Sequence, residues 1–496
     1  MRERLKSKPD AVLCTYLSQP SIEADSKRNF YNMVDINLSH VLMLLKQDII
    51  EVQDAQKILD TLLDLRSKGV SVIELDPEKE DFYFNLESYL INKVGLSVGG
   101  KMHTARSRND ILSTITRMAV RDAVVPLLEK LNVARKCLLQ LADANKDQVL
   151  TGYTHMQPAQ PISLGFYLLA ISQALERDFD RLEAAFSRLN VSALGGGAFA
   201  GTSFPIDREY VAGLLGFDAP IENNMDAVVA RDYLLEYAAD FATLGNTISR
   251  FATDLYYWAT DEFGYVVVDD SIAICSSIMP QKKNPVTLEH LRAKGSHLEA
   301  AYVSIFTVLK GIAFGHCRDT GGESHHLFWD AVNEMNTILE LLILTLNKVS
   351  FKMDKAKERA DSNFSTVTEL ADAIVKEEGV SFREAHEIVG HIVGVCVESG
   401  LRATDINPKM LDDASEQFIS RKLGWSQEHL NSVLDSRNSV NGKTDFGGPN
   451  IEECLKMIRR QTDKLQKDCA RINEIRQQLQ VSQDRLLNEV TNVLKR

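Results

Sequence analysis

Two long stretches of this sequence carry apolar residues at helical spacing with almost no interruption. In residues 231–260 they recur every three or four positions from Leu234 to Trp258, and residues 164–189 show nearly the same pattern. At ~1.5 Å per residue, a helix of about thirty residues spans ~45 Å. Such helices need packing partners along their whole length, so the sequence predicts a bundle of long helices.

Further helices are expected at 328–349, after Asn109 with a bend at Pro126, and after Pro285. We expect an all-α protein of three domains: an N-terminal helical domain at 1–107, the long-helix bundle at 108–356 and a C-terminal helical domain at 357–496. Beyond Pro449 the chain contains neither Gly nor Pro. This tail is predicted to be one amphipathic helix, docked on its own fold or on a neighbouring subunit.

Charge and composition exclude several classes of function. The formal net charge of -13 argues against a nucleic-acid surface, which needs a basic footprint. The sequence shows no signal peptide and no run of about 18 apolar residues, so we expect a cytoplasmic protein without a membrane segment. The seven scattered cysteines fit reduced thiols. His386 and His391 have no third ligand nearby, so no metal site is predicted.

Three segments break the helical pattern and are dense in polar residues. They are "GGKMHTARSRND" at 99–110, "TGYTHMQPAQP" at 151–161 and "SSIMPQKKNP" at 276–285. Each stands where a long helix should begin or end, and rigid helix ends are suited to holding reactive groups.

Each segment also has a purely structural interpretation. "RSRND" could be a helix N-cap with solvated arginines, and Thr154 with His155 could be another capping pair. The third segment has only Ile278 and Met279 as apolar anchors and lacks the spacing of a helix or strand. Packing does not explain its composition, which favours a functional loop.

Together the three segments resemble, in order and spacing, the signature regions of the aspartase/fumarase superfamily, whose signature reads Gly-Ser-Ser-x-Met-Pro-x-Lys-x-Asn. Within it the chain is most similar to the argininosuccinate lyase family. "HTARSRND" resembles that family's His-Thr-Gly-Arg-Ser-Arg-Asn-Asp, and "TGYTHMQPAQP" and "MPQKKNP" resemble its other signatures. "SIEADSKRN", "DREYVAGLLGF", "NNMDAVVARDY" and "FREAHEIVG" extend the resemblance over most of the first 450 residues.

The resemblance implies a three-domain aspartase/fumarase-type fold and a lyase that eliminates an amine from an N-substituted aspartate to give fumarate, reversibly and without a cofactor. It makes Ser276 the catalytic base on a closing loop, with Lys282 stabilising both the alkoxide and the charged intermediate. It pairs His155 with Glu289 to orient the site and tune proton flow.

The resemblance also implies the substrate contacts and the assembly. The residues at positions that grip the fumarate half are Arg108, Asn109, Thr154, Ser277, Met279 and Asn284. Ser21 and Asp25 match positions that touch the amino-acid half. The family forms homotetramers whose active sites are shared between subunits, and the long apolar stripes agree with such burial.

The sequence departs from the family at several positions. Cys275 and Ala105 replace glycines. At 316–324 the family has Tyr-Asn-Lys-Asp-Leu-Gln-Glu-Asp-Lys, and this chain reads "HCRDTGGES", which removes the Tyr, Gln and final Lys that hold the arginine half. We expect His316 and Arg318 to be the replacement contacts.

Three interpretations remain open at this stage. The enzyme could cleave argininosuccinate or a related adduct, or it could serve a different adduct of fumarate with an amino acid or diamine. Alternatively, the chain could be a non-catalytic structural protein, like the lens crystallins derived from this family. The presence of Ser276, Lys282, His155 and Glu289 favours an enzyme.

Overall fold

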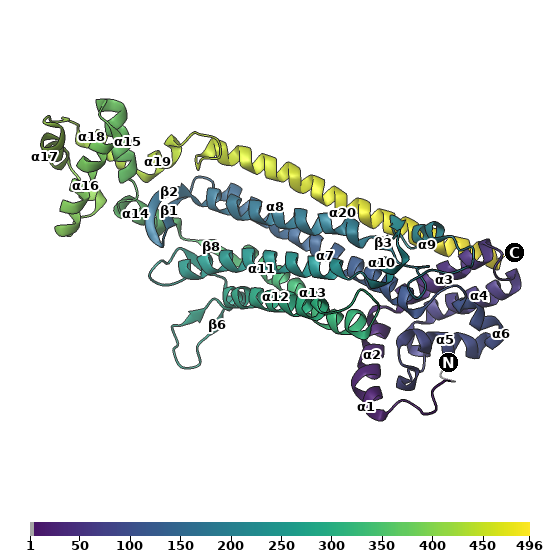
Figure 1. The fold of residues 1–496 in the computed structure, drawn as a ribbon. Helices are drawn as coiled ribbons and strands as arrows, with labels where there is room; N and C mark the ends of the chain where they lie inside the picture. Colours follow the sequence, from purple (N-terminus) through teal and green to yellow (C-terminus); the bar gives the residue numbers. More distant parts are fainter. Residues whose placement is uncertain (1–3) are drawn as a thin grey trace.

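The structure, a computed structural model, describes residues 4–496, so the first three residues of the expected N-terminal domain lie outside it. Helices dominate, and the strands of the described residues form only two-stranded pairs. The predicted all-α class is confirmed. Figure 1 shows a long bundle with a group of shorter helices at each end.

Five long helices form the bundle. They are α7 (Arg108–Ala144), α8 (Leu164–Leu189), α11 (Asp232–Trp258), α12 (Val286–Lys310) and α13 (Ser324–Lys348). All five predicted helices are therefore present, and α7 continues through Pro126 as one helix. The stripe of α11 is buried as predicted, with Leu234, Phe241 and Leu255 completely shielded from solvent.

Two glycines allow α11 and α12 to approach closely. A Cβ atom on Gly295 would lie 2.9 Å from the carbonyl oxygen of Gly245, closer than such contacts occur in proteins. The backbones can therefore meet only because neither residue has a side chain. This contact holds the two helices in a fixed register, and α12 carries the proposed site residue Glu289 in its first turn.

The N-terminal region has its own hydrophobic core, built on Val34, Leu38 and Val41. Its helices are α1 (Ala11–Leu13), α2 (Gln19–Arg28), α3 (Phe30–Lys46), α4 (Val52–Lys68), α5 (Phe82–Val94) and α6 (Leu96–Gly99), with the single turns η1 (Cys14–Ser18), η2 (Val70–Val72), η3 (Pro77–Lys79) and η4 (Gly100–His103). Two short helices, α9 (Arg208–Leu214) and α10 (Asn224–Val229), lie between α8 and α11 in the sequence.

The other end of the bundle carries a second small helical unit with a separate core around Leu370, Ile388 and Leu430. It contains α15 (Val367–Glu378), α16 (Phe382–Glu398), η7 (Ala403–Asp405), α17 (Pro408–Ile419) and α18 (Gln427–Leu434), and α14 (Met353–Ser362) and α19 (Ser436–Gly442) connect it to the bundle.

The tail forms one helix, α20 (Ile451–Leu494), as predicted. It docks on its own fold, running along α7 and α8 back to α3 and α4 (Figure 1). The buried Arg135 of α7 fastens it, because this guanidinium lies 2.7 Å from Asp468 of α20 and 3.3 Å from Glu176 of α8.

Four short strand pairs cap the helices. They are β1 (Val149–Thr154) with β2 (Gln157–Ser163), β3 (Val191–Ser192) with β4 (Ala219–Pro220), β5 (Val266–Val268) with β8 (Val349–Phe351), and β6 (Ile274–Cys275) with β7 (Lys283–Asn284). Two of the three polar segments are therefore parts of hairpins. The sequence spacing indicated no strand around 276–285, because two-residue strands are too short to show an alternating pattern.

Candidate functional site

The segment 276–285 forms a loop that projects from the end of the bundle. Ile274 and Cys275 pair in antiparallel fashion with Asn284 and Lys283, and the intervening residues close the hairpin. The Lys283 ammonium anchors its base by donating to the carbonyl oxygen of Val268 at 2.5 Å. The loop beyond this anchor lies mostly in solvent, and Figure 1 shows it extending away from the helices.

Ser276 lies at the start of this loop with backbone donors around its hydroxyl. Its Oγ accepts from the backbone N–H of Met279 at 3.0 Å and of Ile278 at 3.3 Å, and its own N–H donates to the carbonyl oxygen of Lys282 at 3.3 Å. Two N–H dipoles aimed at one oxygen stabilise negative charge on it. The loop therefore supplies donors that would partly stabilise an alkoxide on this serine.

Lys282 is the free cation of the loop. Among residues 4–496 its ammonium has no hydrogen-bond or ion-pair partner, whereas neighbouring Lys283 is bound to Asp270 at 2.6 Å. Ser277 and Met279 are exposed, and Asn284 is partly buried in β7. The structure thus presents Ser276 and Lys282 together on one projecting, solvent-exposed loop.

Thr154 and His155 lie at the tip of the β1–β2 hairpin and not at a helix terminus, so the capping interpretation is wrong for them. His155 and Met156 have φ angles of 53° and 59°, as the two central residues of a tight hairpin turn require. The turn exposes the imidazole to solvent. Because His155 and Met156 both adopt positive φ angles in this turn, the His155 side chain points outward from the bundle.

Glu289 occupies the first turn of α12, directly after the loop. Its Oε1 accepts from the Tyr256 hydroxyl at 3.5 Å, and Tyr256 belongs to the last turns of α11. His155, Ser276, Lys282 and Glu289 are therefore all at the same end of the bundle, as Figure 1 shows for the elements that carry them.

Arg108 and Asn109 begin α7 at the opposite end. Ser107 caps this helix together with Asp110, so the N-cap part of the interpretation of "RSRND" is confirmed. The expected solvation of its arginines is wrong, because Arg106 is buried and Arg108 is held in ion pairs. Arg108 is bound to Asp81 at 2.8 Å and to Glu80 at 3.1 Å. Its guanidinium would bind a substrate carboxylate only by sharing or exchanging these partners.

Asp110 connects the start of α7 to a glycine-rich loop. Its fully buried carboxylate accepts from the backbone N–H groups of Gly195 at 2.9 Å, Gly197 at 3.0 Å and Ser107 at 3.0 Å. Burial raises the pKa of Asp110 to about 6, against the effect of these donors. Asn109 donates to the carbonyl oxygen of Ala198 in the same loop, so Asp110 positions Asn109.

Asp25 lies on α2 with Asn29 donating to its carboxylate at 2.9 Å. Burial is the main cause that raises the pKa of Asp25 to about 6, and Arg28 and Arg318 act in the opposite direction. Arg318 therefore lies close enough to Asp25 to interact with it. Ser21, one turn earlier on the same helix, is exposed.

His316 and Arg318 lead into η6 (Asp319–Glu323), the turn from which α13 starts. Burial lowers the pKa of His316, and Arg231 and Arg318 lower it further. A Cβ atom at Gly321 would lie 3.3 Å from Cε1 of the His316 ring. The two departures from the family pattern are therefore in contact, with the imidazole occupying the space above a residue without a side chain.

Sequence reasoning missed two residues of this cluster, Arg231 and His325. Arg231 is 3 % exposed, binds Ser113 at 2.8 Å through Nη1, and leaves its buried Nε and Nη2 without partners. The pKa of His325 falls to about 3 because of burial and of the charges on Arg231 and Arg28. In the sequence, Arg231 stands alone just before the apolar stripe of a helix, where an arginine is common. The sequence therefore gave no sign that Arg231 belongs to this cluster.

The two groups of residues lie at opposite ends of one helix. Arg231 precedes α11 and Tyr256 stands near its end, and a helix of 27 residues is ~40 Å long. One chain therefore does not bring Ser276, Lys282, His155 and Glu289 together with Asp25, Arg108 and His316.

The chain is similar to known proteins over nearly its whole length. A family model described as "Lyase" matches residues 27–298, and one described as "Argininosuccinate lyase C-terminal" matches residues 364–441. The chain is 39% identical over 493 residues to argininosuccinate lyase 1 of Shouchella clausii, covering 99% of each protein. It is 39% identical to argininosuccinate lyase of Methanocaldococcus jannaschii, covering 87% of this chain and 88% of that protein.

Solved structures give the same picture. EDDS lyase in complex with formate superposes with a TM-score of 0.88 at 28% identity, covering 100% of this chain and 98% of that one. No helix of residues 4–496 combines the length and the apolar character needed to cross a membrane.

Proposed function

The chain belongs to the argininosuccinate lyase family and is a carbon–nitrogen lyase, and on that premise we propose that it splits an N-substituted aspartate reversibly into fumarate and an amine. The substrate is argininosuccinate or a related fumarate–amine adduct. The observation that carries the chemistry is the hydroxyl of Ser276, which two backbone N–H groups hold ready for negative charge.

In the forward direction Ser276 removes a proton from the carbon next to a carboxylate of the aspartate half. The electron pair moves onto that carboxylate, and its return expels the amine and leaves the carbon–carbon double bond of fumarate. A serine is a weak acid, so this step needs the loop to close and exclude water. The backbone donors and the unpaired Lys282 then stabilise both the alkoxide and the doubly charged intermediate.

The remaining residues bind and orient. Thr154, Ser277, Met279, Asn284, Arg108 and Asn109 hold the fumarate half in this proposal. His155 and Glu289 orient the site and pass a proton towards the leaving nitrogen. Ser21, Asp25, His316 and Arg318 contact the amine half, where Asp25 supplies a carboxylate for a cationic nitrogen.

We further propose that the enzyme is a homotetramer whose active sites are shared between subunits. The separation of the two residue groups along α11 supports this, because one chain alone would leave the reaction without half of its contacts. Exposed apolar side chains on α12, among them Val303 and Phe306, also favour burial against another subunit. A cytoplasmic location is part of the proposal and fits the seven free cysteines.

The test is direct. Purified enzyme is mixed with argininosuccinate, and in the reverse direction with fumarate and a panel of amino acids and diamines, while the absorbance of fumarate is followed. We expect fumarate to form or disappear in at least one mixture. An enzyme inert in every mixture would support the non-catalytic alternative.

A further inference from the structure

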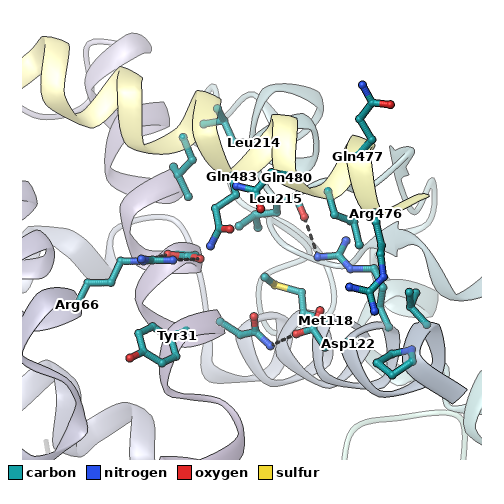
Figure 2. A pocket seen from close by; sticks show the side chains of 17 residues that line it. Tyr31, Arg66, Met118, Asp122, Leu214, Leu215, Arg476, Gln477, Gln480 and Gln483 are labelled. Carbon is teal, nitrogen blue, oxygen red and sulfur yellow. Dashed lines mark hydrogen bonds and ion pairs between the residues drawn. The ribbon is translucent and has the colours of Figure 1, made fainter. Parts of the chain in front are cut away.

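The C-terminal helix covers a cavity that contains none of the residues assigned to the lyase reaction. The cavity has a volume of about 810 Å³ and lies between α20 and the helices α3, α4 and α7. This size is within the range of pockets that hold small molecules. Figure 2 shows Gln480 and Gln483 on the α20 side, with Tyr31 and Asp122 on the other side, and the Gln477 side chain pointing away.

Arg121 lines this cavity as a buried cation, and in the described chain no carboxylate lies within ion-pair distance of it. Asp122 and Asp218 attract it only from farther away. Arg121 is 4 % exposed, and its two Nη atoms donate to neutral acceptors, the Asn190 side chain at 3.0 Å and the Leu215 carbonyl at 3.1 Å. Its buried Nε has no partner, and no carboxylate of residues 4–496 forms an ion pair with it. A buried charge without a carboxylate in direct contact is costly, so an anionic group in the cavity would be favoured.

The next residue provides the opposite charge. Asp122 accepts from the Asn32 amide at 2.9 Å, and within the described chain it has no ion-pair partner, Arg121 included. Pro126 also lines the cavity, and it lacks the N–H to which the carbonyl of Asp122, four residues earlier, would normally be bonded. Asp122 therefore offers a carboxylate and a backbone carbonyl without its helical donor, which together suit an ammonium group.

We propose that this cavity binds a free α-amino acid, whose carboxylate contacts Arg121 and whose ammonium contacts Asp122. The side chain of the ligand would extend towards the glutamines of α20, which gives the tail a role as one wall of a binding site. Asp122 stands fourteen positions beyond Arg108 on α7, a distance of ~21 Å along the helix. The site is therefore separate from the residues assigned to the reaction and does not depend on the proposed function.

Isothermal titration calorimetry on the intact protein tests the proposal. The probes are L-glutamine, L-leucine and L-arginine, each compared with its N-acetyl and its carboxamide derivative. We expect saturable binding of at least one amino acid and at least tenfold weaker binding of both its derivatives, because each derivative loses one charge-assisted contact. Asp122→Asn should weaken the same binding about tenfold.

A matched pair of variants separates this cavity from the catalytic site, which could also bind an amino acid as product. Both positions are exposed on α20, but only Gln480 borders the cavity, so Gln480→Trp places a large ring across it, whereas Asn473→Trp places the same ring away from it. Only Gln480→Trp should abolish binding, and both should unfold at the wild-type temperature. The proposal is overturned if no probe binds, if the derivatives bind equally well, or if binding persists in Gln480→Trp.

Discussion

The His316 ring lies against the backbone of Gly321, 3.3 Å from the position that a Cβ atom would occupy there. The imidazole lies where a side chain at position 321 would begin, so the proposed amine subsite would differ in shape from that of a family member with tyrosine and glutamine at these positions. In Gly321→Gln the His316 ring would have to shift by a few tenths of an ångström.

We predict from this that the enzyme cleaves argininosuccinate weakly or not at all. This chain has Ser324 where the family pattern has a lysine. Without that lysine, a charge-assisted bond worth ~1.5–3 kcal/mol is missing, which corresponds to roughly ten- to a hundredfold in affinity. Steady-state kinetics decides the matter. A kcat/KM of ~10⁴ M⁻¹s⁻¹ or above for argininosuccinate would show that His316 and Arg318 hold the arginine half after all.

Ser276→Ala should lower kcat by a factor of ~10² to 10⁴, since it removes the base and the oxygen that the two N–H groups hold. Binding of fumarate should change far less, because the other proposed contacts remain. Kinetics and fumarate binding are measured on the same preparation, with Ser271→Ala as a control serine outside the loop. Activity of Ser276→Ala within tenfold of wild type would contradict the assignment.

If each active site is built from more than one subunit, two different inactive variants should restore activity when they assemble together. His155→Ala and Lys282→Ala are each expected to be inactive alone. After joint unfolding and refolding, mixed tetramers should regain part of the activity if the two residues reach one site from different subunits. Separate refolding of each variant is the control, and mixtures without any recovered activity would argue that the sites are not shared in this way.

From the raised pKa of Asp25 we predict that substrate binding depends on pH. Its pKa is raised to about 6, so the carboxylate is largely neutral below that pH and attracts a cationic amine only as the pH rises through 6. KM should therefore fall over this interval while kcat changes less. Asp25→Asn should show a high KM without the inflection, and an inflection that survives this substitution would assign it to another group.

The raised pKa of Asp25 also makes the free energy of unfolding depend on pH in a defined direction. Between the ordinary value of 3.8 and about 6, folded Asp25 retains a proton that the unfolded chain has released. Its contribution therefore favours the folded state below the lower value and is lost as the pH rises through the upper one. Chemical unfolding of Asp25→Asn should lack this component.

Asp110→Ala should lower the free energy of unfolding by about 2–4 kcal/mol, because three buried backbone N–H groups lose their acceptor. The loop at 195–198 should loosen with it, which hydrogen exchange at Gly195 and Gly197 would detect. Asp226→Ala, at another helix start, serves as a comparison. Unchanged stability and exchange in Asp110→Ala would show that the loop is held by other contacts.

The sequence by itself determined the long helices, because apolar spacing and helix-stopping residues act over a few positions of the chain. The predicted segment 164–189 coincides with α8, and the tail after Pro449 forms α20. It also located the candidate residues of the reaction loop, since their types and spacing are local. Two-residue strands carry no such local signal, so the hairpin around Ser276 was not predicted. The hairpin around His155 was not predicted either, because its second strand, β2, contains two prolines, which are unusual in strands.

Only the tertiary structure decided which side chains contact one another and which charged groups are left without a partner. Arg108 meets Asp81, His316 meets Gly321 and lies near Arg231, and Arg121 is left without a carboxylate. Such relations depend on how helices cross after packing, which periodicity does not specify. Burial then sets the pKa of Asp25 and the cost of an unpaired Arg231 or Arg121, because both depend on the removal of water by elements distant in the sequence.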